Sequence, residues 1–391
     1  MSRGTAVLVN LLFAFFSLAF ALGLMELAAR AMRVAASGPI AGRYTEADPL
    51  LGWRHRPGAR VNFPQGPYII NSRGLRDRER EYAAPAGRRR ILILGDSFAE
   101  GFSVRLEDAV SQALERLLDR PGCRCEVVNG GTVGYSTDQE YLFYREEGAR
   151  YSPTIVVLFL YYNDIVYNGR AHVGSAPKPL FTFAGGVPRV INYPVPASAP
   201  VRSQAEAGAS PPGRSAAFEW VRMRLMTAAP RFYNRLAGLR LWPRIERAEP
   251  GLELQVYSRH PPPAILQDWN FTVHLLRLLD AEAKSHGAKL LVAYVPSKME
   301  ISEKDWELTR LRYGVDDYRW DRGRVARLLT AAGQAAGFPV LDLTEPLRHA
   351  DRGLLGGPYH RQGGHWNALG HRVAAGDVEA FLRREGWITC R

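Results

Sequence analysis

The sequence predicts an α/β protein: a mostly parallel sheet covered by helices on both faces, doubly wound as a three-layer sandwich, with one transmembrane helix ahead of it. Short apolar runs typical of buried parallel strands alternate with segments whose apolar residues recur at helical spacing. This alternation is typical of sheets whose parallel strands are joined by covering helices. An uncharged stretch near the amino terminus predicts the membrane helix.

Residues 6–24 form this stretch and contain no charged side chain. At a helical rise of about 1.5 Å per residue they would extend roughly 28 Å, close to the hydrocarbon thickness of a bilayer. The apolar region of a secretory signal is usually shorter, about 7–15 residues. We therefore expect residues 1–33 to be a retained signal-anchor, although the small residues Ala29 and Ala31 leave cleavage open.

The flanking charges bear on the orientation of this helix. Arg3 precedes the stretch, whereas Arg30 and Arg33 follow it, and a strict count slightly favours a cytoplasmic main domain. A five-residue tail before an apolar stretch is nevertheless the layout of a signal-anchor. We expect a single-pass protein whose main domain is extracytoplasmic, or periplasmic.

Residues 34–87 combine glycine and proline with short apolar runs, which predicts lead-in strands and turns packed on the main domain. The main α/β domain is expected to span residues 88–391. Its strands are expected at residues 91–94, 125–129, 154–161, 289–295 and 340–343. Its helices are expected at residues 108–119, 138–148, 264–286 and 322–336, with a last helix closing near residue 385.

The alternation stops between about residues 168 and 262, which we interpret as an insertion. Residues 193–216 are rich in Pro, Ala and Ser, a composition typical of flexible segments. Residues 218–241 are arginine-rich and partly apolar, and they predict an amphipathic helix. A lid, a partner surface and a disordered spacer all fit such an insertion.

The chain is basic, with a net charge of +12 and an isoelectric point near 9.8. It has no zinc-ligand spacing, no aromatic–basic RNA signature and no long basic run, so no nucleic-acid partner is expected. The charge favours anionic lipid or glycan instead. Cys123 and Cys125 are poorly placed to pair with each other, and a bridge to Cys390 stays open.

Four polar or glycine-containing motifs follow predicted strands or open the last helix: Gly95-Asp96-Ser97, the turn ending at Gly134, Asn163-Asp164 and His365-Trp366-Asn367. The carboxyl ends of parallel strands lie at one edge of a sheet, so these loops should converge there. A serine nucleophile needs a base, which histidine supplies near neutral pH, and the oxyanion needs N–H donors. These residue types suit acyl transfer.

In these motifs the chain resembles the SGNH hydrolases, the GDSL-type esterases and acyl-transfer enzymes. The resemblance implies that Ser97 is the nucleophile and His365 the general base. It also implies an oxyanion hole formed by the backbone N–H groups of Ser97 and Gly134 and by the Asn163 side chain. The resemblance covers residues 88–166 and 264–385, but neither the insertion nor residues 1–60.

The chain departs from the family at one place. An aspartate usually stands two or three residues before the histidine and orients its ring, but Gly363 and Gln362 occupy those positions here. A backbone carbonyl, or a carboxylate from elsewhere, would have to hold the ring. The candidate acids are those in the segments that lead to His365: Asp342, Glu345 and Asp351.

Other interpretations of these residues are weaker. His360, His365 and His371 match no zinc-ligand spacing, so we expect neither a metal nor another cofactor. The Gly-x-Ser-x-Gly pentapeptide of the α/β-hydrolases does not occur. Asp96 is expected to shape its turn. Trp366, like the pair Tyr161-Tyr162, fits either an aromatic wall for a sugar ring or the core.

The sequence therefore predicts a membrane-anchored serine-dependent acyl ester hydrolase or O-acyltransferase. Its most plausible substrate is an extracytoplasmic glycan that carries O-acetyl groups. A lipid or thioester hydrolase is an alternative enzyme. A non-catalytic SGNH domain that binds glycan or polysaccharide-export partners is the alternative of another class.

Overall fold

The computed structural model describes residues 3–36, 44–183, 188–197, 215–240, 242–245, 247–353, 356–360 and 363–389. The chain divides into two compact units. One comprises residues 1–40 and 203–244, and the other comprises residues 41–202 and 245–391. We call the first the anchor unit and the second the α/β unit.

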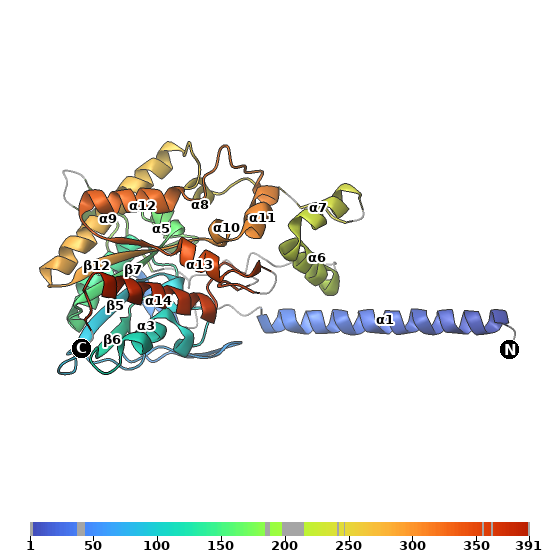
Figure 1. Cartoon of the computed structure of the whole chain (residues 1–391), viewed down its shortest axis with the longest axis horizontal. Coiled ribbons are helices and arrows are strands. Elements are labelled where there is room, and N and C mark those ends of the chain that lie inside the picture. The colour runs from blue at the N-terminus through green and yellow to red at the C-terminus, as the bar shows by residue number, and fades with distance from the viewer. Residues whose placement is uncertain are drawn as a thin grey trace. The chain divides into compact units, whose positions relative to one another are not determined.

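A parallel sheet forms the centre of the α/β unit (Figure 1). Its order is β13-β12-β7-β5-β6, and every neighbouring pair is parallel. The strands are β5 (Arg89–Gly95), β6 (Cys125–Asn129), β7 (Ile155–Tyr161), β12 (Lys289–Val295) and β13 (Val340–Asp342). The chain winds outward from β5 to β6, then returns past β5 to β7 and continues the other way. Such a reversal opens a crevice at the carboxyl ends of the strands.

Helices cover both faces of the sheet, as expected of a doubly wound three-layer sandwich. One face packs on α3 (Val110–Leu118), α13 (Thr344–Ala350) and α14 (Ala368–Arg384). The other face packs on α4 (Thr137–Glu146), α9 (Pro263–Ser285) and α12 (Arg324–Ala336). The two helical layers lie on opposite sides of the strands in Figure 1. The predicted fold class is confirmed.

Several short helices complete this unit. They are α2 (Ser97–Glu100), α5 (Tyr162–Tyr167), α8 (Leu252–Gln255), α10 (Lys298–Ile301) and α11 (Glu303–Tyr313), with 3₁₀ turns at Leu106–Asp108 and Gly148–Tyr151. Helices α10 and α11 were not expected from the sequence.

The lead-in segment forms two antiparallel hairpins. The first pairs β1 (Thr45–Asp48) with β2 (Gly52–His55), and the second pairs β3 (Arg60–Phe63) with β4 (Gly66–Ile69). The indole N–H of Trp53 in β2 donates to the carbonyl of Val133 at 2.9 Å. The first hairpin is thereby tied to the loop that follows β6.

The insertion contains more regular structure than its composition suggests. Two small hairpins come first: β8 (His172–Val173) with β9 (Ala176–Pro177), and β10 (Phe181–Thr182) with β11 (Arg189–Val190). The single amphipathic helix predicted over residues 218–241 is wrong. Two helices occur instead, α6 (Ala216–Ala228) and α7 (Pro230–Gly238), because Pro230 cannot donate to the preceding turn. Residues 198–214 of the predicted flexible segment lie outside the described residues.

The anchor unit consists of α1 (Arg3–Ala36), α6 and α7. Its residues 12–30 are long and apolar enough to cross a membrane, and they are almost wholly exposed. This property is shared by membrane anchors and signal sequences.

Cys123 and Cys125 differ in oxidation state. Cys123 is disulfide-bonded, whereas Cys125 is a buried free thiol, so the two do not pair with each other. Cys390 lies outside the described residues.

Candidate active site

Ser97 lies where β5 passes into α2, at the carboxyl edge of the sheet. Gly95 ends the strand with φ +143°, and a Cβ there would come within 2.8 Å of the Phe159 carbonyl oxygen. Asp96 caps α2 by accepting the Phe98 N–H at 2.8 Å. The turn therefore needs this glycine and this acid, and it presents Ser97 as the first helical residue.

His365 reaches Ser97 from the far end of the chain. Its Nε2 lies 2.8 Å from Ser97 Oγ, although 268 positions separate the two residues. The segment around His365 is tied down by the Ser103 hydroxyl, which donates to the Trp366 carbonyl at 2.8 Å. Asn367 then caps α14 by accepting the N–H groups of Leu369 and Gly370.

The ring of His365 is held in an aromatic setting. The rings of Phe98 and Phe102 lie 5.3 and 5.7 Å from it, measured between centroids. Burial, and secondarily the nearby His360, lower the pKa of His365 to about 4. The imidazole is therefore neutral near pH 7, which is the state that can accept the Ser97 proton.

The three candidate orienting acids make other contacts. Asp342 accepts the N–H and hydroxyl of Thr344, Asp351 accepts the Gly353 N–H, and Glu345 pairs with Arg348. Within the described part of the chain, no carboxylate forms an ion pair with His365. Gln362 lies outside the described residues, and Gly363 adopts a left-handed φ of +86°.

The loop after β6 brings Gly134 to the same edge. Its φ of +73° is one that glycine adopts without strain. The loop is fixed by the Thr132 N–H, which donates to the Gly95 carbonyl at 3.0 Å, and by the Trp53 indole on Val133. Within the described residues, the backbone N–H groups of Ser97 and Gly134 have no hydrogen-bond acceptor. Both are free to meet a developing oxyanion.

Asn163 lies in the first turn of α5, directly after β7. Its side-chain amide hydrogen-bonds the carboxylate of Asp96. An amide nitrogen carries two hydrogens, so one can bind Asp96 while the other remains for a substrate oxygen. The sequence suggested only a turn-shaping role for Asp96. Its position beside Ser97 was the available signal, but its contact with Asn163 follows only from the fold.

Buried carboxylates continue beneath this site. Burial raises the pKa of Asp96 to about 7 against the opposing hydrogen bonds from Phe98 and Asn163. Burial and the neighbouring acids also raise the pKa of Glu140 and Asp164 well above the usual range. Neither carboxylate oxygen of Glu140 has a hydrogen-bond partner within the described residues. The shifts favour the neutral forms of Glu140 and Asp164, which opposes the accumulation of negative charge in this region.

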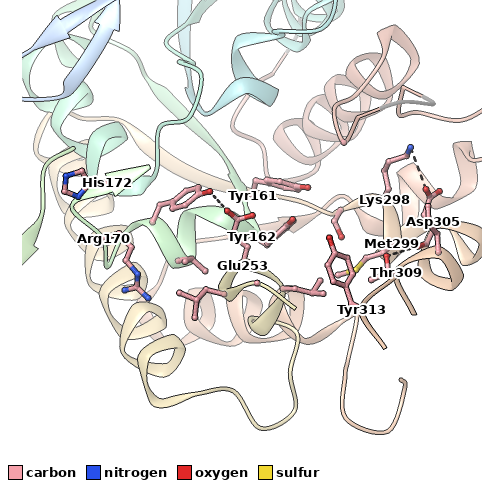
Figure 2. A pocket seen from close by; sticks show the side chains of 18 residues that line it. Tyr161, Tyr162, Arg170, His172, Glu253, Lys298, Met299, Asp305, Thr309 and Tyr313 are labelled. Carbon is pink, nitrogen blue, oxygen red and sulfur yellow. Dashed lines mark hydrogen bonds and ion pairs between the residues drawn. The ribbon is translucent and has the colours of Figure 1, made fainter. Parts of the chain in front are cut away.

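A cavity of about 660 Å³ lies in the α/β unit, and neither Ser97 nor His365 is among the residues that line it (Figure 2). Tyr161, Tyr162 and Tyr313 line it together with Arg170 and Lys298. It extends to Gly364, the residue before His365. Trp366, by contrast, is fully buried, so it is a core residue and not part of an aromatic wall.

Residues 262–389 match a family described as "SGNH hydrolase-like domain, acetyltransferase AlgX". This segment is SGNH hydrolase-like. This family of acyl ester hydrolases and acetyltransferases fits the sheet order and the serine–histidine pair. The matched segment contains His365, whereas Ser97, Gly134 and Asn163 precede it.

Solved structures similar to the SGNH-like chain include a lipase/acylhydrolase from Enterococcus faecalis and a GDSL-like lipase from Bacteroides thetaiotaomicron. The first is 13% identical with a TM-score of 0.37, covering 78% of this chain and 98% of its own. The second is 12% identical with a TM-score of 0.34, covering 76% and 89%. TM-scores this low carry no argument, so the fold assignment rests on the sheet order and the family match. No curated protein sequence matches the chain.

Proposed function

We propose that this SGNH-like protein is a membrane-anchored serine-dependent acyltransferase or esterase that acts on O-acetyl groups of an extracytoplasmic glycan. The observation that carries the proposal is the 2.8 Å contact between Ser97 Oγ and His365 Nε2 at the carboxyl edge of the sheet. A nucleophile within hydrogen-bond reach of its base is the arrangement that covalent acyl transfer requires.

In the proposed reaction, Ser97 Oγ attacks the ester carbonyl while His365 Nε2 takes the hydroxyl proton. The N–H groups of Ser97 and Gly134 and the Asn163 amide stabilise the negative oxygen of the tetrahedral intermediate. Collapse breaks the ester bond, and His365 returns the proton to the leaving alcohol. Water or a sugar hydroxyl then attacks the acyl-serine, with His365 again as base, and frees Ser97.

The cavity supports a glycan as the substrate. Tyrosine rings such as Tyr161, Tyr162 and Tyr313 offer flat, partly polar surfaces on which sugar rings can lie. Arg170 and Lys298 add polar groups to the lining, and each is paired with an acid, Asp268 and Asp305 respectively. The name of the matched family supports acetyl as the transferred group.

The disulfide at Cys123 supports the extracytoplasmic side, because disulfides form and persist mainly in oxidising compartments. The apolar helix α1 supports attachment to the membrane. An enzyme tethered there would meet a glycan during export, so the proposal includes polysaccharide-export proteins as partners.

The test is turnover of p-nitrophenyl acetate and labelling by a fluorophosphonate probe, using the full-length protein in detergent. Wild type should react, and Ser97→Ala should lose both activities while keeping the wild-type melting temperature. The matched control is Ser285→Ala, which removes an exposed hydroxyl at the end of α9. Labelling that persists in Ser97→Ala would show that another residue is the nucleophile.

A non-catalytic binding domain is the second candidate. It is favoured by one observation: no carboxylate of the described residues pairs with His365. If folded wild-type protein reacts with neither ester nor probe but binds acetylated glycan, this second function replaces the first.

A further inference from the structure

The insertion helix α6 packs against α1, and α7 packs against α6. The carboxylate of Glu26 on α1 accepts the N–H groups of Ala216 and Ala217, each at 2.9 Å, and the Ser215 hydroxyl at 2.6 Å. The first N–H groups of a helix have no acceptor within that helix, so this carboxylate acts as a cap supplied from another element. Ala29 packs against the same two alanines. The start of α6 is therefore fixed to one point on α1.

That point lies at the end of the apolar stretch. Glu26 follows the uncharged residues 6–24 and pairs at 2.7 Å with Arg30, the last residue of the membrane-compatible segment. Charged side chains are costly inside the hydrocarbon core. If α1 crosses a bilayer, Glu26 and Arg30 therefore lie near the headgroups, and α6 begins at that depth.

Helix α6 exposes a face suited to this depth. Trp220, Met223 and Arg224 recur at helical spacing, and the first two are 41% and 39% exposed. The Arg224 guanidinium lies 4.8 Å from the centre of the Trp220 indole ring. Tryptophan beside arginine is typical of the boundary between acyl chains and headgroups, where an indole is partly buried and a guanidinium reaches phosphate.

Helix α7 repeats the pattern. Phe232 and Leu239 are 52% and 69% exposed and seven positions apart, so they share a face, and the exposed Arg235 lies between them. On the opposite side of α7, Tyr233 and Ala237 are buried.

The charge of the two helices complements an anionic surface. Residues 215–240 contain five arginines and one acidic residue, Glu219. Glu219 is buried and paired with Arg222 at 2.7 Å, which leaves the exposed charge positive. Apolar and aromatic groups together with arginine are the composition of helices that lie in the interface of anionic bilayers.

We propose that α6 and α7 form a membrane-surface module that lies on the bilayer crossed by α1. Trp220, Phe232 and Leu239 enter the acyl-chain boundary, and Arg224 and Arg235 bind anionic phospholipid headgroups. This inference rests on the proposed membrane attachment and goes beyond the proposed chemistry, because it assigns a lipid-binding role to the insertion.

The test uses the full-length protein in vesicles whose lipids carry bromine in the acyl chains, which quenches tryptophan by contact. Helix α1 contains no tryptophan, so quenching cannot arise from the membrane-spanning segment itself. Vesicles of phosphatidylcholine with phosphatidylglycerol should quench the wild type. Trp220→Phe should lose at least half of the quenched emission. The matched control Trp387→Phe, in the α/β unit, should lose none of it.

The anionic lipid should increase quenching because it binds Arg224 and Arg235. Omitting phosphatidylglycerol should reduce quenching at least twofold in the wild type, and the double variant Arg224→Gln/Arg235→Gln should show no such dependence. Protein that fails to float with the vesicles would refute the membrane anchor itself. If the protein floats with the vesicles but Trp220→Phe leaves the quenching unchanged, the surface module alone is overturned. A third outcome would be a dimer in detergent that the double variant Phe232→Ser/Leu239→Ser dissociates, with no quenching by lipid. That result would also overturn the surface module, and it would assign the exposed face of α7 to self-association.

Discussion

At the scale of single residues, a carboxylate hydrogen-bonds the side chain that we propose as a donor in the oxyanion hole. Asp96 hydrogen-bonds the Asn163 side chain and caps α2 at the same time. It therefore links the segment that carries Ser97 to the segment that carries Asn163. Asp96 is a positioning residue, and its contribution should appear through Asn163.

We predict that Asn163→Ala lowers kcat by roughly 10²–10³-fold with a smaller change in KM, the loss expected for one oxyanion donor. Steady-state kinetics on p-nitrophenyl acetate measure this directly. The melting temperature serves as the control. A large fall in stability with normal kcat in the folded fraction would show that Asn163 is only structural.

The depressed pKa of His365 predicts an unusual pH profile. The pKa is about 4, so the ring stays neutral down to that pH, and titration of His365 should not lower kcat/KM between pH 7 and about 5. Below about pH 4 the ring takes a proton, cannot accept one from Ser97, and the rate should fall. An inflection near 6.5, the usual histidine value, that persists in Asp96→Asn would contradict the burial of His365.

Asp96→Asn is the control for this profile. Because burial raises the pKa of Asp96 to about 7, the wild type has a second group that titrates near neutrality. Any inflection near pH 7 should vanish in Asp96→Asn, while the fall near pH 4 should remain.

Much of the site could be predicted at this scale. Ser97, Gly134 and Asn163 each follow a buried strand, and parallel strands bring such positions to one edge whatever their distance in sequence. The aromatic setting of His365 could not be predicted, because it depends on the path of the loop that carries Phe102. The partners of Asp342, Glu345 and Asp351 likewise depend on local turns that leave no pattern in the sequence.

At the scale of elements, the lead-in hairpin β1–β2 supports the catalytic edge. Trp53 holds Val133 through its indole, and the Tyr135 hydroxyl donates back to the Trp53 carbonyl at 2.6 Å. Gly134 lies between these two bonded residues. The hairpin therefore fixes the position of the Gly134 N–H.

We predict that Trp53→Phe lowers kcat about tenfold and the free energy of unfolding by about 1–3 kcal/mol, because the Val133 carbonyl loses its buried donor. Kinetics and urea denaturation measure the two effects, with Trp387→Phe as the matched control. Unchanged kcat in a folded Trp53→Phe protein would contradict the supporting role of the hairpin.

The central strands were predictable because their apolar runs are buried on both faces. Helices α10 and α11 were missed because they are short or mostly polar. Their signals are in the caps: the Ser297 and Glu300 side chains form a capping box, and Ser302 caps α11. Pro230, which divides α6 from α7, was also visible in the sequence.

At the scale of the whole molecule, the disulfide provides a test of compartment. We predict that Cys123 reacts with maleimide only after reduction, whereas Cys125 reacts once the chain is unfolded. Peptide mapping by mass spectrometry distinguishes the two thiols. Cys123→Ser should cost about 2–5 kcal/mol of stability. A Cys123 that is alkylated without reduction in protein from the native host would place the domain in a reducing compartment.

The division into two units has a consequence for how a soluble form of this protein should be cut. The polypeptide passes between the anchor unit and the α/β unit three times, near residues 40, 202 and 244. Trimming the amino terminus alone would strip α6 of the Glu26 carboxylate and uncover Ala216 and Ala217. The truncated chain would expose these two alanines and leave their N–H groups without the Glu26 acceptor, so it should aggregate. Excising residues 203–244 together with residues 1–40, and rejoining the ends with a short glycine–serine bridge, would remove the whole folding unit instead of half of it.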